Sequence, residues 1–506
     1  MQIPDHHPVI VGTGQRTWRD SDVGRTPVDA LHEAAAAAIA DCGGKGVADA
    51  VDTLATVRFI ADTRPDTAAL FPRNPGAEIA RRLGLADPAL FIGAIGGNTP
   101  QYLVNHFASG LARGEYGAVL LTGGELMATL FAALRSGGDL GAWAGDDTEE
   151  PPTVGEERDG LSAMEERHGL YQPINTYPLF ENSLRHHLGL DDTAHRALLA
   201  DISSRMSAVA AANPNAWRQE ALSAAEIAAV GPRNRYIGYP YTRAMNALLE
   251  VDMAAAVVMT TAGRARQLGI DDERWIYVRG GVDVNDIWYP SERRDLHSSP
   301  AIELAWQHLS QGSGLGIDDL SHFDIYSCFP SAVQIGCAAL GLSPLDPRGV
   351  TVTGGLPFFG GPGNNYSLHA IAQMVDTLRA GSGGAGLVTA VGLYMTKHSL
   401  GLYATEPGEL LAAFIDSDPL QAEIESGPRV AVAADAAGPA TVETWTVAFD
   451  RNGPRQGILM ARNADGERLV ANTADDAASL EALLAEDPIG HGGRVRVEDG
   501  RNIIEL

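Results

Sequence analysis

The side chains best suited to chemistry lie in two short segments of the second half of the sequence. Tyr326, Ser327 and Cys328 stand side by side, and Lys397 and His398 follow an apolar run that predicts a strand. A cysteine thiolate can attack a carbonyl carbon, and a neutral histidine can accept and return a proton. Cys328 and His398 are therefore candidates for acyl transfer or hydrolysis, with Tyr326 as a third candidate.

Each of these residues also has a structural interpretation. A free cysteine is usually a small, inert residue of the core. His398 would serve equally well as a buried hydrogen-bonding group, and Tyr326 would then bind a ligand or hold a loop. The sequence leaves these alternatives open.

A second set of residues has the size and polarity of ligand-binding groups. Glycine lets a ligand approach the main chain closely, and hydroxyl, amide and ammonium groups orient it by hydrogen bonds. The candidates for binding are Asn98, Thr99, Ser327, Gly360, Gly361, Asn364, Asn365, Tyr366 and Lys397.

No metal centre is predicted. Cys42, Cys328 and Cys337 lack the spacing of zinc ligands, and we expect reduced thiols. One group of acidic residues with a histidine has helical spacing and predicts a solvated face: Glu156, Glu157, Glu165, Glu166 and His168.

The elements that must position these residues follow an α/β pattern. Residues 8–13 predict a strand, and residues 26–41 predict a helix with Pro27 in its first turn. An apolar run at residues 89–95 leads through a glycine-rich loop into a helix that begins at Pro100. In that helix Leu103, Phe107 and Leu111 share one face, and residues 117–121 then predict a strand.

The same order returns from about residue 270. Residues 275–278 and 322–326 predict strands, and a helix begins at Pro330. The strand-to-helix corners at residues 95–100 and 326–330 therefore take corresponding places in two halves. We predict an internal duplication with mainly parallel strands in each half.

Two further segments do not fit this repeat. Residues 127–241 are rich in proline and too long for a simple connection, so they predict an inserted loop domain. Residues 409–415 predict one or two amphipathic turns. Short strands follow at residues 430–432, 441–449, 457–462, 468–472 and 495–497. These strands predict a small all-β domain, and a five-stranded barrel like the oligonucleotide-binding fold is one way to close them.

The charge of the chain excludes several classes of function. Its formal net charge is −27, and no run of Lys and Arg offsets it, so we expect no nucleic-acid partner. No apolar run approaches the roughly 20 residues of a membrane span. The first residues lack the pattern of a signal peptide, and a cytoplasmic location is expected.

Several ordered motifs together resemble the thiolase superfamily. These are residues 91–104 with Gly114 and residues 122–125, then residues 251–256, 324–333 and 354–363. The resemblance covers about residues 1–405. It implies an α/β thiolase fold of two duplicated βαβαβ-type halves in a layered αβαβα arrangement. The resemblance implies a first thiolase half at residues 1–126 and 242–270 and an inserted loop domain at residues 127–241. The second thiolase half is then at residues 271–407, and the linker with the additional β domain is at residues 408–506.

The departures from the thiolase pattern affect its catalytic positions. The nucleophilic cysteine of thiolases aligns with Gly97, and the activating histidine aligns with Gly361. The second cysteine aligns with Ala390 in an Ala-Val-Gly sequence. This pattern, with the extra C-terminal domain, is similar to thiolase-like proteins type 1, which are often labelled acetyl-CoA acetyltransferase. Ordinary thiolase activity is not expected.

The resemblance still implies a thioester ligand. We expect coenzyme A or an acyl-CoA, with no covalently bound cofactor and a role in lipid or fatty acid metabolism. Arginines of the loop domain could hold the phosphates: Arg185, Arg205, Arg233, Arg235 and Arg243. The alternatives are a binding or scaffolding subunit without catalysis and a thioester hydrolase that uses Cys328 or His398. A homodimer or another protein partner is left open.

Overall fold

A large mixed sheet forms the centre of the molecule. The protein is described by a computed structural model, which covers residues 4–145, 149–381, 383–408 and 417–506. Within these ranges no helix has both the length and the apolar composition needed to cross a membrane. The first part of the sheet contains β1 (Pro8–Thr17), β2 (Thr53–Thr56), β3 (Ala89–Gly93), β4 (Ala118–Leu126), β5 (Thr153–Val154) and β8 (Asp252–Thr261). The second part contains β9 (Ile276–Asn285), β10 (His322–Asp324), β11 (Ala385–Gly392) and β12 (Lys397–Ala404).

The sheet order shows the internal duplication directly. It runs β10-β11-β12-β9-β1-β8-β4-β2-β3-β5, so β1 and β9, the first strands of the two halves, meet in the middle. Each first strand pairs antiparallel with the last strand of its half, β8 or β12. Next come the parallel pairs β4 with β2 and β11 with β10. The prediction of two duplicated halves is confirmed.

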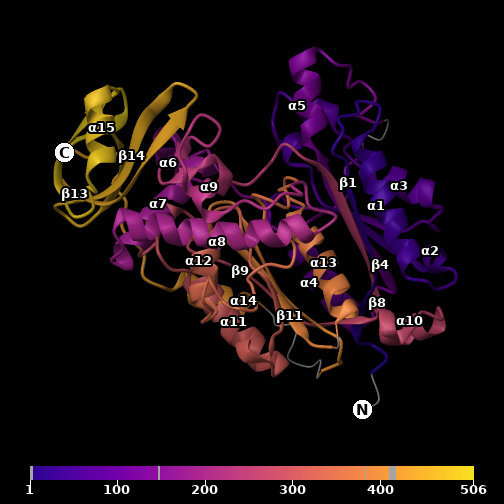
Figure 1. Cartoon of the computed structure of the whole chain (residues 1–506). Coiled ribbons are helices and arrows are strands. Elements are labelled where there is room, and N and C mark those ends of the chain that lie inside the picture. Colours follow the sequence, from indigo (N-terminus) through magenta and orange to yellow (C-terminus); the bar gives the residue numbers. More distant parts are fainter. Residues whose placement is uncertain (1–3, 146–148, 382, 409–416) are drawn as a thin grey trace.

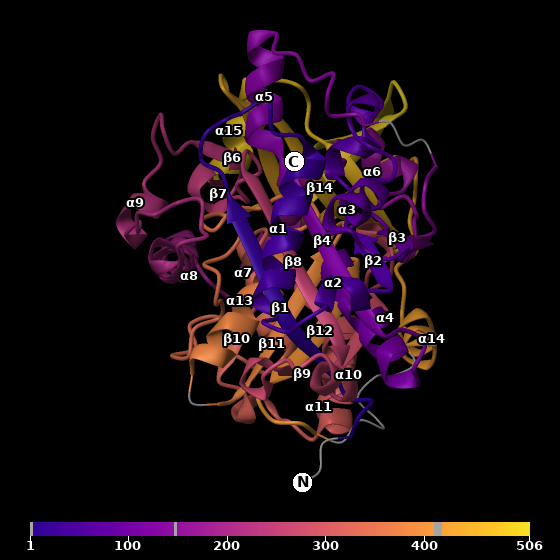
Figure 2. The same cartoon turned by 90° about the vertical axis from the view of Figure 1, so that its right-hand side faces the viewer.

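Helices form three layers around this sheet. The helices α4 (Thr99–Arg113) and α13 (Tyr366–Ala380) contact each other and strands of both halves, so they lie between the halves. Outside the first half lie α1 (Pro27–Asp41), α2 (Val47–Ala50), α3 (Pro75–Leu83) and α10 (Ala262–Gln267). Figure 2 shows α1 in front of β1, β8 and β4. Outside the second half lie α11 (Pro300–Ser313) and α12 (Pro330–Ala339), which completes the αβαβα arrangement.

The predicted correspondence between the two corners is wrong. The helix α12 follows β10, which pairs with β11 as β2 pairs with β4, so α12 takes the place of α3. The counterpart of α4 is α13, its partner in the middle layer. Among its described residues the second half has no strand in the place of β3, so matching the helices by their order along the sequence paired α12 with α4.

The loop domain covers one end of the two halves. It contains α5 (Met127–Ser136), α6 (Ala163–Arg167), α7 (Pro173–His187), α8 (Asp192–Ala212) and α9 (Ala224–Ala228), followed by β6 (Tyr236–Gly238) and β7 (Tyr241–Thr242). Its β5 also pairs with β3 and extends the edge of the central sheet.

The C-terminal segment forms a closed five-stranded barrel. It consists of β13 (Gly438–Asp450), β14 (Gly453–Asn463), β15 (Arg468–Asn472), β16 (Gly492–Glu498) and β17 (Arg501–Glu505). The pairing of β13 with both β14 and β16 closes the ring. Two helices accompany the barrel, α14 (Asp418–Glu425) and α15 (Ala477–Ala485), and sequence reasoning missed both helices and β17. The strand predicted at residues 430–432 is not formed, and only Val432 makes an isolated bridge, to Arg468. Residues 409–415 lie outside the described part of the chain.

The barrel packs closely on the loop domain, as Figure 1 shows beside α6 and α7. Asn182 of α7 donates a hydrogen bond to the carbonyl of Trp445 (2.8 Å), and Thr444 donates to the carbonyl of Leu179 (2.6 Å). A cluster of apolar side chains inside the barrel includes Trp445. The barrel therefore seals a face of α7 from solvent.

The predicted solvated face around residue 160 is partly wrong. Glu165 and His168 are fully buried, while Glu156, Glu157 and Glu166 are exposed. The Nε2 atom of His168 accepts a hydrogen bond from the backbone N–H of Asn502 in the barrel (2.9 Å). Helical spacing could not reveal this burial because the covering domain lies far away in sequence.

Candidate functional site

The N-terminus of α4 forms one side of the candidate site. Pro100 occupies the first turn, and Gly114 ends the helix in the left-handed conformation (φ 76°). The hydroxyl of Thr99 donates to the carbonyl of Ala94 (2.5 Å), and Ser367 of α13 donates to the carbonyl of Gly97 (2.7 Å). The loop before α4 is therefore fixed from both helices of the middle layer.

Tyr326 fills the space beside Gly97. A Cβ atom added at residue 97 would overlap the hydroxyl of Tyr326 and lie 2.6 Å from the carbonyl oxygen of Val391. Tyr326 is held by its backbone N–H, which donates to Thr389 (3.0 Å), and by an edge contact with the ring of Tyr366. The structure thus brings Gly97 and Tyr326 together and places a phenol where a side chain of residue 97 would begin.

Burial keeps Tyr326 and Cys328 protonated. It raises the pKa of the Cys328 thiol to about 12 and the pKa of Tyr326 well above its usual value. The hydroxyl of Tyr177, which donates to the carbonyl of Leu393 (3.0 Å), also lies close to Cys328. Cys328 therefore resembles a core thiol, and Tyr326 is a neutral hydrogen-bond donor.

Ser327 and Tyr366 hold a loop. Ser327 accepts a hydrogen bond from the backbone N–H of Leu356 (3.1 Å), and Tyr366 donates to the buried carboxylate of Asp324 (2.9 Å). Asp324 also accepts from Thr353 (3.0 Å). These contacts position residues 351–356, which lead into the glycine-rich segment.

The glycine-rich segment is packed less tightly at Gly361 than the loop before α4 is at Gly97. A Cβ atom at Gly361 would lie 3.2 Å from Leu356, without a severe overlap. Gly363 has a φ of 52°, and its Cα faces the buried carboxyl of Glu125. Burial raises the pKa of Glu125 to about 8. Gly360 also adopts a positive φ of 118°, which disfavours any side chain there.

Asn364 and Asn365 connect the two halves of the fold. Asn364 donates to the carbonyl of Arg58 (2.9 Å), and Asn365 donates to the carbonyl of Gly123 (2.7 Å). Both side chains thus fix the loop before α13 to the first half. These contacts support a structural role rather than ligand binding.

Lys397 and His398 do not follow the last strand of the second half; they begin β12. The ammonium group of Lys397 donates to the carbonyls of Ile95 (3.1 Å) and Glu156, and burial lowers its pKa. Asn98 lies nearby and donates to Ser399 (3.3 Å). Lys397 therefore ties residues 149–157 to the loop before α4.

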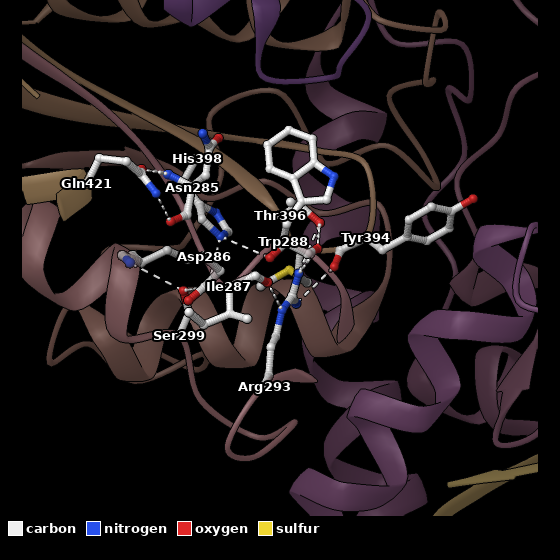
Figure 3. Close-up of polar contacts among 12 residues, drawn as sticks. Asn285, Asp286, Ile287, Trp288, Arg293, Ser299, Tyr394, Thr396, His398 and Gln421 are labelled. Atoms are coloured by element: carbon white, nitrogen blue, oxygen red, sulfur yellow. Dashed lines mark hydrogen bonds and ion pairs between the residues drawn. The ribbon is translucent and has the colours of Figure 1, made fainter. Parts of the chain in front are cut away.

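His398 belongs to a buried polar cluster, shown in Figure 3. Its Nε2 atom lies 3.1 Å from both a carboxylate oxygen of Asp286 and the carbonyl oxygen of Met395, so Nε2 carries the hydrogen. The guanidinium of Arg293 donates to Thr396 (3.0 Å) and to the surrounding carbonyls of Ile287, Trp288 and Tyr394. Asp286 has a lowered pKa because His398 and Arg293 outweigh its burial.

A separate cavity of about 590 Å³ lies in the loop domain. Arg218, Arg233 and Arg243 line it, and none has an ion pair or a side-chain hydrogen bond within the described residues. Burial and the neighbouring Arg243 lower the pKa of Arg218. We name this the arginine cavity. Sequence reasoning named Arg233 and Arg243 but missed Arg218, which had no distinctive motif around it.

The other arginines that were predicted to bind phosphates contact protein groups outside the arginine cavity. Arg185 pairs with Asp487 of the barrel (2.6 Å). Arg205 donates to the carbonyl of Leu345 (2.8 Å), and Arg235 donates to the carbonyl of Tyr236 (2.9 Å).

Backbone contacts connect the arginine cavity with the corner around Gly97. Ala244 lines the cavity, and residues 244–248 continue from it. In that segment Ala247 donates to the carbonyl of Cys328 (3.2 Å), and the carbonyl of Leu248 accepts from Gly361 (2.9 Å). One short segment therefore borders both places.

Comparisons with known proteins agree with this architecture. A family model described as the thiolase-like protein type 1 additional C-terminal domain matches residues 419–501. The crystal structure of a monomeric SCP2-thiolase-like protein type 1 from Mycobacterium smegmatis is 35% identical, covers 100% of both chains and has a TM-score of 0.84.

Two more distant relatives share parts of the chain. The structure of an Ltp2-ChsH2(DUF35) aldolase is 21% identical, with a TM-score of 0.60 over 79% of this chain and 98% of that chain. A 3-ketoacyl-CoA thiolase of Erwinia tasmaniensis is 30% identical over 165 residues. That match spans 29% of this chain and only 35% of the length of the thiolase.

Proposed function

Because the chain belongs to the family of SCP2-thiolase-like proteins type 1, we propose that it binds coenzyme A or an acyl-CoA without forming a thiolase acyl-cysteine. The observation that carries the binding proposal is the arginine cavity. Arg218, Arg233 and Arg243 line it together with Glu226, and within the described residues none of the three arginines pairs with a carboxylate, although the chain as a whole is strongly acidic. Unpaired guanidinium groups bind phosphates through short, charge-assisted hydrogen bonds.

The position of the cavity suits a thioester ligand. Residues 244–248 lead from its wall to Cys328 and Gly361. A ligand whose phosphates lie on the arginines could then direct its acyl end toward the corner of Gly97 and Tyr326. The Tyr326 hydroxyl, kept protonated by burial, would be a hydrogen-bond donor for a thioester carbonyl there.

The same corner argues against thiolase chemistry. Residue 97 has no side chain, and the Tyr326 hydroxyl occupies the adjoining space. The nearest thiol in the motif, Cys328, has a pKa of about 12, so almost none is ionised at neutral pH. A hydrolase that uses Cys328 as nucleophile is disfavoured for the same reason.

Calorimetric titration tests the binding proposal. We expect coenzyme A to bind to the full chain, and we expect Arg218→Ala, Arg233→Ala and Arg243→Ala each to weaken binding by about tenfold or more. The tenfold change in affinity follows from the loss of one charge-assisted hydrogen bond. Arg205→Ala is the matched control, because Arg205 is exposed, belongs to the loop domain and points to Leu345.

Two results would contradict the proposal. The first is the absence of heat with millimolar coenzyme A and folded protein, which would favour a scaffolding subunit. The second is equal weakening by the cavity variants and by Arg205→Ala, which would show only a general charge effect.

A further inference from the structure

A second polar cavity, of about 320 Å³, lies behind the N-terminus of α4. Four segments form its walls: the start of α4, residues 154–156, the adjoining ends of β9 and β12, and the start of α14. We name it the rear cavity. It shares no lining residue with the arginine cavity, so the inference below does not depend on the proposed function.

Buried hydrogen bonds converge on Asp283 in this cavity. Asn105 of α4 donates to the carboxylate of Asp283 (3.1 Å), and Gln101 donates to the carbonyl oxygen of the Asn105 side chain (2.9 Å). From the other side, Asn98 donates to Ser399 (3.3 Å), which is hydrogen-bonded to Asp283. Each of these hydrogen bonds is donated along the network in the direction of the Asp283 carboxylate.

Two buried side-chain atoms of residues that line the rear cavity have no hydrogen-bond partner within the described part of the chain. His398 is 1% exposed, and its Nδ1 atom is unpaired. In the neutral ring with its hydrogen on Nε2, toward Asp286 and Met395, Nδ1 is a hydrogen-bond acceptor. Figure 3 shows His398 beside Asn285 and Gln421, which also line the rear cavity. The side-chain oxygen of Asn98, which is 6% exposed, is the second unpaired acceptor.

The charges around the cavity are predominantly negative. Asp283, Asp418 and Glu156 all lie close enough to Tyr102 to raise the pKa of its hydroxyl, after burial as the largest cause. The one ammonium group, that of Lys397, already donates to two backbone carbonyls. The cavity therefore offers carboxylates and unpaired acceptors and has few free donors.

We propose that the rear cavity binds a small primary amine in its ammonium form, with Asp283 as the main anionic partner and the Nδ1 atom of His398 as a further acceptor. An ammonium group supplies three donors and one positive charge. It would donate hydrogen bonds to buried acceptors, because buried acceptors are costly to leave unsatisfied.

Calorimetry with three probes of similar size tests this proposal on the full chain. Propylamine should bind at least about tenfold more tightly than 1-propanol and propionate, because only the amine can make a charge-assisted bond to Asp283. Asp283→Asn should remove this preference. Asp376→Asn is the matched control, because Asp376 is a carboxylate of α13 that accepts from Thr13 outside the cavity.

The wild-type protein gives an independent readout through pH. Burial raises the pKa of Asp283 to about 7, whereas propylamine stays protonated, so affinity should increase as the pH rises through 7. The other titratable groups facing the site are Tyr102, Glu156, Lys397, His398 and Asp418. Equal binding of amine and alcohol, unchanged preference in Asp283→Asn, or no binding of propylamine would each overturn the proposal.

Discussion

Gly97 and Gly361, which the thiolase resemblance aligns with a cysteine and a histidine, differ in what surrounds them. The Tyr326 hydroxyl and the Val391 carbonyl crowd Gly97, while the nearest atom to a Cβ at Gly361 is a terminal carbon of Leu356 at 3.2 Å. The packing around residue 97 therefore excludes a side chain, whereas a small shift of Leu356 would admit one at residue 361.

This difference predicts that one added methyl group changes the stability of the protein much more at residue 97 than at residue 361. Gly97→Ala should lower the free energy of unfolding by about 2 kcal/mol, because a well-packed site must shift both a buried tyrosine and backbone. Gly361→Ala, the control, should change it by less than about 1 kcal/mol. Urea unfolding of both variants measures the effect, and equal stability of Gly97→Ala and wild type would show that Tyr326 moves freely.

A buried histidine makes stability depend on pH. His369 in α13 is fully buried, its Nδ1 atom lies 2.9 Å from Gln15, and burial lowers its pKa to about 3. The native state therefore keeps this ring neutral at pH values where the unfolded chain binds a proton. The contribution of the neutral His369 ring to the free energy of unfolding is complete above pH 6.5, and it is lost as the pH falls from 6.5 toward 3.

His369→Gln should reduce the slope of unfolding free energy against pH by about 1.4 kcal/mol per pH unit between pH 6 and pH 4. Denaturant titrations at several pH values give this slope. The exposed His186 provides the control, and His186→Gln should leave the slope nearly unchanged. If the two variants had the same slope, His369 would not be the group that stays neutral.

At the scale of elements, one arginine joins the barrel to the second half of the fold. Arg468 of β15 is 2% exposed, pairs with Glu443 (2.6 Å) and donates to the carbonyls of Ser291 (3.1 Å) and Arg293. Arg462 pairs with the same Glu443 (2.7 Å), but its side chain is 31% exposed.

Arg468→Ala should therefore cost about 3 kcal/mol of unfolding free energy, since it leaves buried acceptors and a carboxylate without their partner. Arg462→Ala should cost about 1 kcal/mol or less, as expected for a solvent-exposed pair. Guanidinium unfolding of both variants gives the comparison. Similar costs would mean that the barrel is only loosely attached.

The sequence was sufficient for elements with local signals. The strands and helices around residues 8–41 and 89–126 follow hydrophobic periodicity, proline starts and glycine ends, and β15 was predicted at its observed bounds. The predicted equivalence of the two corners failed because local patterns do not show that β3 has no counterpart among the described residues of the second half. The burial of His168 and the isolation of Arg218 depend on contacts between segments far apart in sequence, which local patterns cannot reveal.

At the scale of the whole molecule, the barrel and loop domain form one packed end rather than an appended module. Asn182 and Thr444 donate hydrogen bonds across this contact, and His168 accepts one from Asn502 of the barrel. The arginine cavity lies in the same loop domain, and residues 244–248 continue from it to contacts with Cys328 and Gly361. Under the proposed function, this end of the molecule holds a thioester ligand and offers it no cysteine at residue 97.

Intact-protein mass spectrometry after incubation with saturating acetyl-CoA tests this central claim most directly. The protein should retain its unmodified mass, because residue 97 has no side chain and the Cys328 thiol has a pKa of about 12. Calorimetry under the same conditions should show that the ligand is bound. An acetyl adduct that forms rapidly on Cys328, and disappears in Cys328→Ala, would contradict the account.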